Sequence, residues 1–188
     1  MQCRGLSVVE LLVALAIAAM LAAAALPAMS FYVAAQDSTS AINQLTGAVQ
    51  FSRAAAITGR HTVTLCPSTN GVDCAKRDDW HRGAIAFADV NKNGVADPED
   101  TVLAAFPPLP NGSRAFWRSF RNKSYLSFAP SGLTSWQNGH FRYCPRDSDP
   151  RLIREIVVNP QGRVRRAPDR NRDGIVEDTS GQPVSCPE

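Results

Sequence analysis

The sequence has little of what a metal site or an enzyme requires. It contains three scattered histidines, His61, His81 and His140, and no two of its five cysteines have the C-x-x-C spacing of a zinc site. It contains no nucleophile beside a base partner, no glycine-rich phosphate loop and no metal triad. These absences argue against an enzyme, a cofactor and a small-molecule substrate.

Charge is also absent from one long stretch of the chain. No charged residue occurs in residues 11–36, which exceeds the roughly 20 apolar residues that an α-helix needs to cross a membrane. The stretch predicts a membrane helix with Arg4 on the cytoplasmic side. A secretory signal cleaved near residues 22–24 is the alternative, but a discarded signal has no reason to keep the carboxylate of Glu10. Both interpretations predict that the rest of the chain is exported across the membrane.

The cysteines that are present fit an oxidising compartment. Cys3 lies in the basic leader and leaves an even set of four, Cys66, Cys74, Cys144 and Cys186. Three pairings of these four are possible. We favour a bond between Cys66 and Cys74 across a short loop, and one between Cys144 and Cys186 that holds the C-terminal tail.

A helical pattern continues beyond the apolar stretch. Apolar and small residues recur at intervals of three and four, at Ile42, Leu45, Val49, Ser52 and Ala56. Gly59 suits the end of the helix. The pattern predicts one long helix from Leu6 to about Thr58, bare in its first half, amphipathic in its second, and kinked at Pro27, which lacks an amide hydrogen.

From His61 onward the periodicity changes to two. Short segments rich in β-branched or aromatic residues alternate with turn clusters; they read HTVTLC, GAIAFAD, TVLAAF, SYLSFA, HFRYC and REIVVN. They predict an antiparallel β-sheet domain of six or seven strands that packs on the amphipathic half of the helix. The fold class expected is therefore α+β.

Positive charge is concentrated late in the chain. Residues 101–172 contain thirteen lysines or arginines, nearly all arginines, and four acidic residues, whereas the whole chain has a formal net charge of +3. The concentration predicts a basic surface on the later half of the sheet domain.

The N-terminus resembles that of the type IV prepilins. The residues that carry the resemblance are Gly5, Leu6, Glu10 and Pro27, together with the unbroken apolar stretch. The resemblance implies that a prepilin peptidase cuts between Gly5 and Leu6 and that the new amine of Leu6 is methylated. Glu10 would then neutralise such an amine in an adjacent subunit, because removing either partner of a buried pair costs about 3–5 kcal/mol. Leu6 departs from the phenylalanine usual at this position.

The rest of the chain resembles the GspH/FimT family of minor pilins and pseudopilins. The match runs in order through LCPSTNGVDC, the segment at residues 80–100, and IVVNPQGRVR. It implies a leader at 1–5, a transmembrane assembly half-helix at 6–33 and a periplasmic pilin domain at 34–188. The subunit would sit in the inner membrane by a single pass, and in a pilus or pseudopilus after assembly with other subunits. The alternatives are a type II secretion pseudopilin that contacts exported protein without DNA and, remotely, a membrane-anchored periplasmic enzyme.

One short motif sharpens this resemblance. Gly162-Arg163-Val164-Arg165 is similar to the G-R-x-R motif of FimT-type minor pilins linked to DNA uptake. As a strand it places Arg163 and Arg165 on one face, where they could contact neighbouring phosphates, with Arg166 extending the track. Such contact would be salt-sensitive and independent of base sequence. The alternative is a solvated face, or arginines that pair with acids of a neighbouring subunit.

The aromatic residues allow two interpretations. Phe116, Trp117 and Tyr125 lie close in sequence to arginines, which makes base stacking conceivable. Trp80 and Trp136 are interpreted as core or sheet-edge residues.

A calcium loop is a weaker hypothesis. Residues 89–100 place oxygen side chains at calcium-loop spacing, namely Asp89, Asn91, Asn93, Asp97 and Asp100. A second loop, which starts at Asp169, repeats the beginning of this pattern but interleaves arginines that would repel a cation. We favour a plain Asn-Gly hairpin for the first loop.

Overall fold

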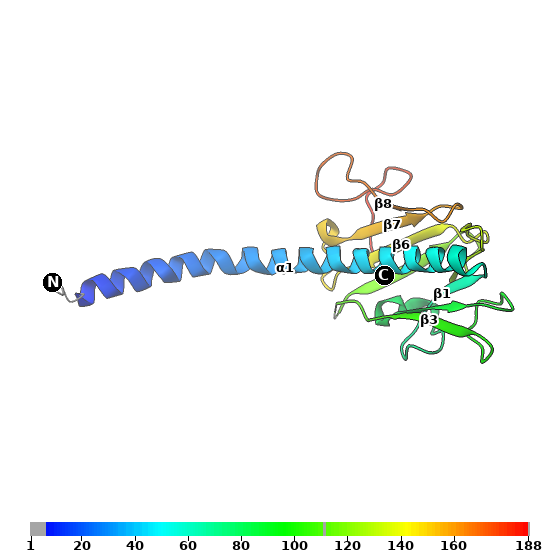
Figure 1. Cartoon of the computed structure of the whole chain (residues 1–188). Coiled ribbons are helices and arrows are strands. Elements are labelled where there is room, and N and C mark those ends of the chain that lie inside the picture. Colours follow the sequence, from blue (N-terminus) through cyan, green and yellow to red (C-terminus); the bar gives the residue numbers. More distant parts are fainter. Residues whose placement is uncertain (1–6, 111, 188) are drawn as a thin grey trace. The chain divides into compact units, whose positions relative to one another are not determined.

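The computed structural model of the chain describes residues 7–110 and 112–187, apart from the side chains of residues 24–28 and 77–78. The chain divides into two units, Met1–Gln36 and Asp37–Glu188. A single helix, α1 (Val8–Gly59), begins in the first unit and continues into the second (Figure 1). Its end at Gly59 agrees with the boundary expected from the sequence.

In the first unit, the described large apolar side chains of α1 are exposed along its length; Val8 near its start is 73% exposed, and Val33 near the end of the unit is 51% exposed. Within the described residues, no helix combines the length and the apolarity that crossing a membrane requires. The transmembrane half predicted at residues 6–33 is therefore not confirmed. The helix assignment runs without a break through Pro27, whose side chain is not described, so the kink stays a prediction.

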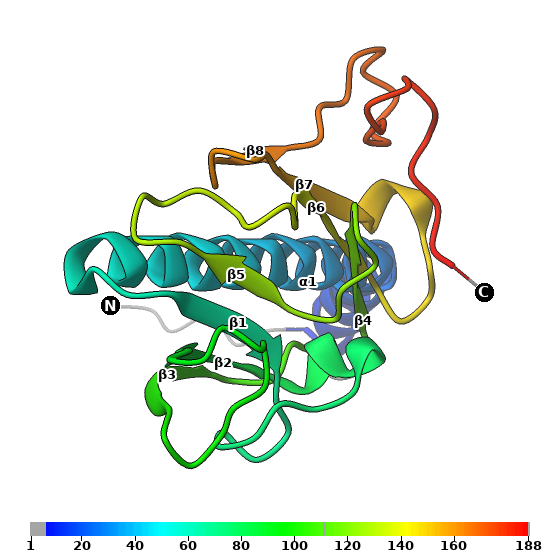
Figure 2. The same ribbon diagram turned by 90° about the vertical axis from the view of Figure 1, so that its right-hand side faces the viewer.

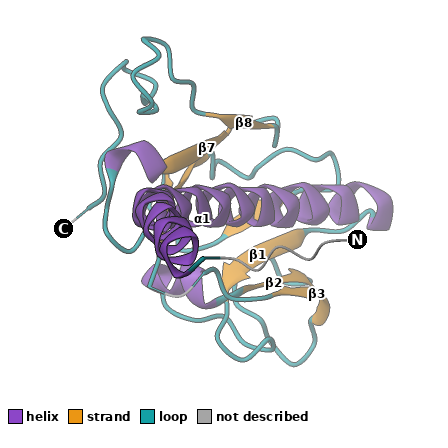
Figure 3. Ribbon diagram, turned by 90° about the vertical axis from the view of Figure 1, so that its left-hand side faces the viewer, coloured by secondary structure: helices purple, strands orange, loops and turns teal. Residues whose placement is uncertain are grey.

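The second unit contains eight strands in the described residues. They are β1 (Val63–Pro67), β2 (Ala84–Ala88), β3 (Thr101–Phe106), β4 (Arg114–Ser119), β5 (Leu126–Phe128), β6 (Gly139–Cys144), β7 (Arg154–Val158) and β8 (Val164–Arg166). Two short 3-10 helices, Arg77–Arg82 and Pro150–Leu152, precede β2 and β7. Loops and turns make up the chain after β8 (Figure 3).

The strands form two sheets, where the sequence predicted one. Sheet A has the order β3-β2-β1-β5 and sheet B the order β4-β6-β7-β8, and every pairing between neighbours is antiparallel. Strand β4 is not among the predicted strands, because RAFWRS contains two arginines and no β-branched residue. Figures 2 and 3 show β7 and β8 on one side of the second-unit part of α1 and β2 and β3 on the other.

The main core lies between this part of α1 and both sheets. Ile42, Leu45 and Val49 on the predicted apolar face are at most 4% exposed, and they belong to one cluster with Phe128 of sheet A and Phe141 of sheet B. Each large apolar side chain buried in this way contributes about 1.5–3 kcal/mol to folding. The helix therefore supports both sheets, and the inner face of sheet B is fixed against it.

Candidate nucleic-acid interface

The turn between β7 and β8 presents the arginine motif. Asn159 fixes this turn through two hydrogen bonds. Its side-chain oxygen accepts from the backbone amide of Arg163 at 2.9 Å, and its backbone amide donates to the Arg163 carbonyl at 3.1 Å. Gly162 completes the turn with a φ of +71°, in the left-handed region that glycine tolerates. The backbone of the motif is therefore fixed by local hydrogen bonds.

An arginine of α1 joins this turn to the connection between β5 and β6. The Nε atom of Arg53 donates to the carbonyls of Gly132 and Gln161, each at 3.2 Å. A Cβ atom on Gly162 would meet the Gly132 carbonyl oxygen and would lie 2.9 Å from Cδ of Arg53. The glycine of the motif is thus required by close packing as well as by its backbone conformation.

The two arginines of the motif and the following Arg166 do not share one face. The side chain of Val164 packs against the main core, and Arg166, two residues further on, hydrogen-bonds to Asn43 of α1. Arg163 and Arg165 are exposed, and neither guanidinium has a hydrogen bond or ion pair to another described residue. The structure therefore brings Arg163 and Arg165 together as candidates and separates Arg166 from them.

Register extends the basic surface across sheet B. Arg118 of β4 pairs with His140 of β6, His140 with Val157 of β7, and Val157 with Arg165 of β8, so the four residues form one row. Because side chains alternate along a strand, this row lies on the face opposite the buried Phe141. We call this face, which points away from α1, the outer face of sheet B.

The outer face also contains a buried ion pair. The Glu155 side chain is 2% exposed and accepts hydrogen bonds from Nε and Nη2 of Arg142, at 2.9 and 2.8 Å. His140 lies beside the pair, with Nε2 4.0 Å from the Glu155 carboxylate. Burial lowers the pKa of His140, and Arg142 and Arg118 lower it further against the opposing effects of Glu155 and Asp178. The Glu155 carboxylate is therefore matched by Arg142. Glu177 and Asp178 of the C-terminal tail line a pocket together with Arg165, so this part of the face combines arginines with carboxylates.

The aromatic residues close to arginines in sequence do not form a stacking surface. Trp117 is 2% exposed and packs against Phe141 with ring centroids 4.4 Å apart, while Phe116 is half-buried. In the arginine-rich later part of the chain, Phe120 at 74% and Trp136 at 68% are exposed instead. Of the core and sheet-edge positions expected for Trp136, the core position is wrong, because the neighbouring Gln137, and not the indole ring, is buried.

Two disulfides tie down loops of the second unit. Cys66 is bonded to Cys74, and Cys144 to Cys186, which is the arrangement favoured from the sequence. The second disulfide attaches the C-terminal tail to β6, where the Nη1 atom of Arg142 also donates to the Ser185 carbonyl. The tail is therefore held at two points beside the outer face of sheet B.

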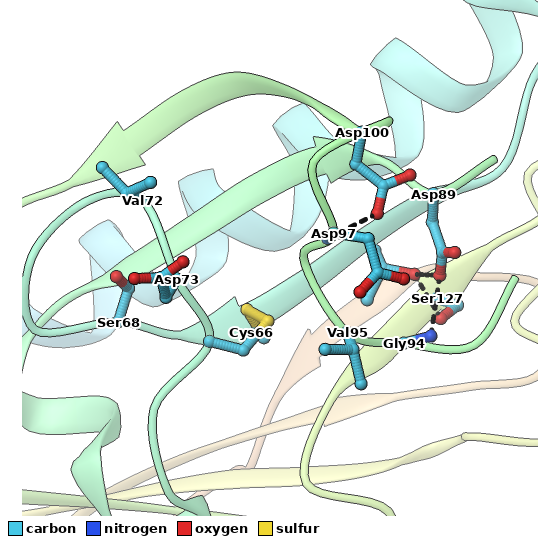
Figure 4. The surroundings of a disulfide bond; sticks show 12 residues. Cys66, Ser68, Val72, Asp73, Asp89, Gly94, Val95, Asp97, Asp100 and Ser127 are labelled. Atoms are coloured by element: carbon cyan, nitrogen blue, oxygen red, sulfur yellow. Dashed lines mark hydrogen bonds between the residues drawn. A yellow bond between two sulfur atoms is a disulfide. The ribbon is translucent and has the colours of Figure 1, made fainter. Parts of the chain in front are cut away.

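The candidate calcium loop is organised by its own hydrogen bonds. Asp89 is buried, and its Oδ2 atom accepts from the Thr64 hydroxyl at 2.6 Å and from the Gly94 amide at 3.1 Å. Figure 4 shows Asp89 directed toward Gly94 and toward Ser127, whose hydroxyl lies 2.6 Å from that of Thr64. Asp89 therefore connects the loop to sheet A.

The remaining oxygen side chains of this loop bond to one another or to its backbone. The amides of Asn91 and Asn93 donate to Asp97 and lower its pKa, while Asp100 accepts from the Val90 and Asp97 amides. In the part of the chain that the structure describes, no group of three or more His, Cys, Asp or Glu is placed to hold a metal ion. The loop is a hydrogen-bonded turn, as favoured from the sequence.

The candidate assembly residues lie in the first unit. Glu10 is exposed in the first turn of α1. Gly5 and Leu6 lie outside the described residues, so the structure does not bear on the predicted cleavage.

Comparison with known proteins defines the class. The model of the type II transport protein GspH matches residues 41–162, and that of the prokaryotic N-terminal methylation motif matches residues 1–26. A long N-terminal helix followed by antiparallel sheets, together with this motif, defines a pilin-like structural subunit and not an enzyme. The GspH model covers more than half of the chain, and the chain therefore belongs to the GspH family.

Solved structures agree with this fold. Two crystal forms of the type IV minor pilin FimU from Pseudomonas aeruginosa match with TM-scores of 0.54 and 0.53 at 18% and 17% identity. The first match covers 79% of this chain and 93% of FimU, the second 69% and 92%. The minor pseudopilin EpsH of the Vibrio cholerae type 2 secretion system matches with a TM-score of 0.48 at 9% identity. This match covers 69% of this chain and 95% of EpsH. A sequence search of curated proteins finds no match.

Proposed function

We propose that this chain is a minor subunit of a pilus that binds DNA without sequence preference through Arg163 and Arg165. One observation carries the proposal: the side chains of Arg165 in β8, the edge strand of sheet B, and of Arg163 directly before it are exposed and have no described hydrogen-bond or ion-pair partner. Arginine is suited to phosphate because its planar fork can donate two parallel hydrogen bonds. The turn that presents these arginines is held in place by Arg53, so little ordering is needed on binding.

The surroundings support an anionic partner. Residues 112–146 contain no aspartate or glutamate but six lysines or arginines, and residues 156–168 contain none but three arginines. The acidic residue between these segments that faces the sheet, Glu155, is matched by Arg142. A polyanion that approaches Arg163 therefore meets no opposing carboxylate from either segment, whereas Glu177 and Asp178 of the tail line a pocket beside Arg165.

Assembly would use the N-terminal residues. Cleavage between Gly5 and Leu6 by a prepilin peptidase creates an amine, which Glu10 of an adjacent subunit neutralises as the helices bundle, after release from the inner membrane. Two charges that are paired in a dry helix bundle are tolerated where a single one is not, so the pair fixes the register of neighbouring subunits. Mass spectrometry of the mature chain should find N-methyl-Leu6. A mature start after Ala24 or Ala28 would contradict this part of the proposal.

The DNA proposal is tested by salt dependence. Full-length chain in nonionic detergent is titrated with a labelled 30-base-pair duplex between about 50 and 200 mM salt, alongside an Arg163→Ala/Arg165→Ala variant. Each phosphate contact contributes about 0.9 to the slope of log K against log salt, so the variant should lose about 2 from that slope. A Lys76→Ala/Lys92→Ala variant removes the same charge from exposed positions outside both basic segments and should bind like the parent.

The same titration separates the competing function. A parent chain that shows no salt-dependent binding, or an arginine variant that binds as well as the parent, would exclude DNA contact through these residues. The remaining candidate is then a type II secretion pseudopilin that touches exported protein and no DNA.

A further inference from the structure

Two exposed aromatic side chains lie at one end of sheet B. Phe120 directly follows β4 and is 74% exposed, and Trp136 lies shortly before β6 and is 68% exposed. The two segments are joined, because the Phe120 amide donates to the Asn138 carbonyl at 2.8 Å. Exposed apolar rings that gather on one part of a surface are typical of an interaction site.

Strand register places these rings at the same end of the sheet as the arginine motif. Ser119 pairs with Gly139, Gly139 with Val158, and Val158 with Val164, so one row crosses all four strands. Phe120 follows one end of this row and Arg163 precedes the other. Strands in a sheet lie about 4.8 Å apart, so the two residues stand about 14 Å from each other across three strand spacings.

Trp136 is held outward by a strained backbone. Its φ is +61°, which is unusual for a bulky residue and marks a site worth a functional hypothesis. The adjacent Gln137 is 6% exposed, and its side-chain oxygen accepts from the Ser127 amide at 2.7 Å, which anchors the segment to β5. The fold thus buries Gln137 and turns the neighbouring indole to solvent.

Cations lie close to the rings of Trp136 and Tyr125. The guanidinium of Arg121 lies over the Trp136 ring, 5.7 Å from its centroid. The ammonium of Lys123 lies 5.7 Å from the Tyr125 ring, which borders the Asp89–Asp100 loop described above. Arg118 stands on the outer face one residue before the row. Rings interleaved with cations match the composition of surfaces on which bases stack while phosphates are neutralised.

We propose that Phe120 and Trp136 form a stacking platform for unpaired bases of single-stranded DNA, whose phosphates are contacted by Arg121 and Arg163. This inference rests on the proposed DNA contact and specifies its substrate class. Bases in a duplex are stacked on each other and offer no face to a protein ring, so the platform discriminates in favour of a single strand. A protein partner would find the same rings, but the absence of acidic residues from 112–146 favours a polyanion.

The chain provides its own optical probe for the test. Of its three tryptophans, Trp80 and Trp117 are 1% and 2% exposed, so a base can stack only on Trp136. Full-length chain in nonionic detergent is titrated with a 20-nucleotide oligo-thymidine and with a 20-base-pair duplex at one salt concentration. The single strand should quench tryptophan fluorescence, and the duplex should not.

Variants assign the effect. Trp136→Gly suits the positive φ and removes the ring; it should abolish the quench and weaken single-strand binding about 5- to 150-fold, with duplex binding within twofold of the parent. Phe120→Ala should weaken single-strand binding in the same direction, and Trp136→Phe should retain most of it. Val72→Ala, a substitution at an exposed apolar position in the loop of the Cys66–Cys74 disulfide, is the matched control. Far-ultraviolet circular dichroism confirms that each variant is folded.

The outcomes separate this inference from the function on which it rests. If Trp136→Gly binds the single strand as the parent does, the platform is wrong, whereas the arginine contact survives as long as Arg163→Ala/Arg165→Ala still loses the duplex. If the parent binds neither DNA, both proposals fail. If Trp136→Gly leaves both DNAs unchanged but weakens co-assembly with another pilin subunit, the rings are a protein contact and the inference is overturned.

Discussion

Replacing Gly162 by alanine tests why the arginine motif begins with glycine. The new Cβ would meet the Gly132 carbonyl oxygen and would lie 2.9 Å from Cδ and 3.0 Å from Nε of Arg53. To make room, the turn must move away from α1, and the hydrogen bonds from Arg53 to Gly132 and Gln161 must lengthen or break. The substitution therefore combines backbone strain with the loss of a clamp.

The cost follows from these two contributions. A left-handed backbone costs a residue with a Cβ about 1–2 kcal/mol, partly offset by about 0.4–1 kcal/mol from the reduced entropy of the unfolded chain. Breaking a hydrogen bond from a charged donor adds about 1.5–3 kcal/mol. We expect Gly162→Ala to lower the free energy of unfolding by about 2–4 kcal/mol and to weaken duplex binding, because the arginines lose their fixed position.

A second glycine separates the two contributions. Gly71 has a φ of +75°, but a Cβ there would meet nothing closer than a side-chain atom of Ala105 at 3.8 Å. Gly71→Ala should therefore lose only about 0.5–1 kcal/mol and bind DNA like the parent. Urea unfolding of full-length chains, compared at equal m-values, measures both losses. Equal losses in the two variants would refute the role assigned to the clamp.

Three further predictions concern sheet B. Arg142→Met should lower the free energy of unfolding by about 3–5 kcal/mol in urea titrations by leaving Glu155 buried without its partner, and adding Glu155→Leu should restore most of it; an unrescued double variant would contradict this. Removing the Cys144–Cys186 bond, which spans 42 residues, should lower the free energy of unfolding by about 4 kcal/mol, whereas removing the Cys66–Cys74 bond, which spans 8, should lower it by about 2.5 kcal/mol. Equal decreases of the urea midpoint in the two variants would argue against the loop-entropy explanation. Burial holds the pKa of His140 below its ordinary value of 6.5, so stability should fall as the pH drops below 6.5; His140→Gln should flatten this fall, and an unchanged profile would exclude His140 as its source.

The sequence predicted the helix and most strands because their periodicity is strong. Ile42, Leu45 and Val49 repeat at helical intervals, and β-branched runs separated by Asn-Gly turns are unambiguous. It did not predict the division into two sheets, since strand order depends on pairings between residues far apart in the chain. Strand β4 was not predicted because Arg114 and Arg118, which lie on its outer face, are equally compatible with a loop when the pairing of the segment with β6 is unknown.

The arginine motif was visible in sequence, but the aromatic platform was not. A motif of fixed spacing needs no tertiary information, and its turn glycine identifies it further. By contrast, Trp117 and Trp136 are both tryptophans with a polar or basic residue beside them, and the local sequence does not show which of the two is buried. The difference arises from register: Trp117 falls on the inner face of β4, whereas Trp136 precedes a glutamine whose side chain takes the interior position.

The contact between Arg53 and the β7–β8 turn has a mechanical consequence. Tension on a DNA strand held by Arg163 would pull on a turn in which the Gln161 carbonyl accepts a hydrogen bond from the Arg53 side chain of α1. Force would then pass into the helix directly instead of unzipping β8, the outermost strand of its sheet, from β7 one hydrogen bond at a time. In a retracting fibre whose subunits pack through that helix, the load would travel along the helices from subunit to subunit, and the sheets would carry little of it.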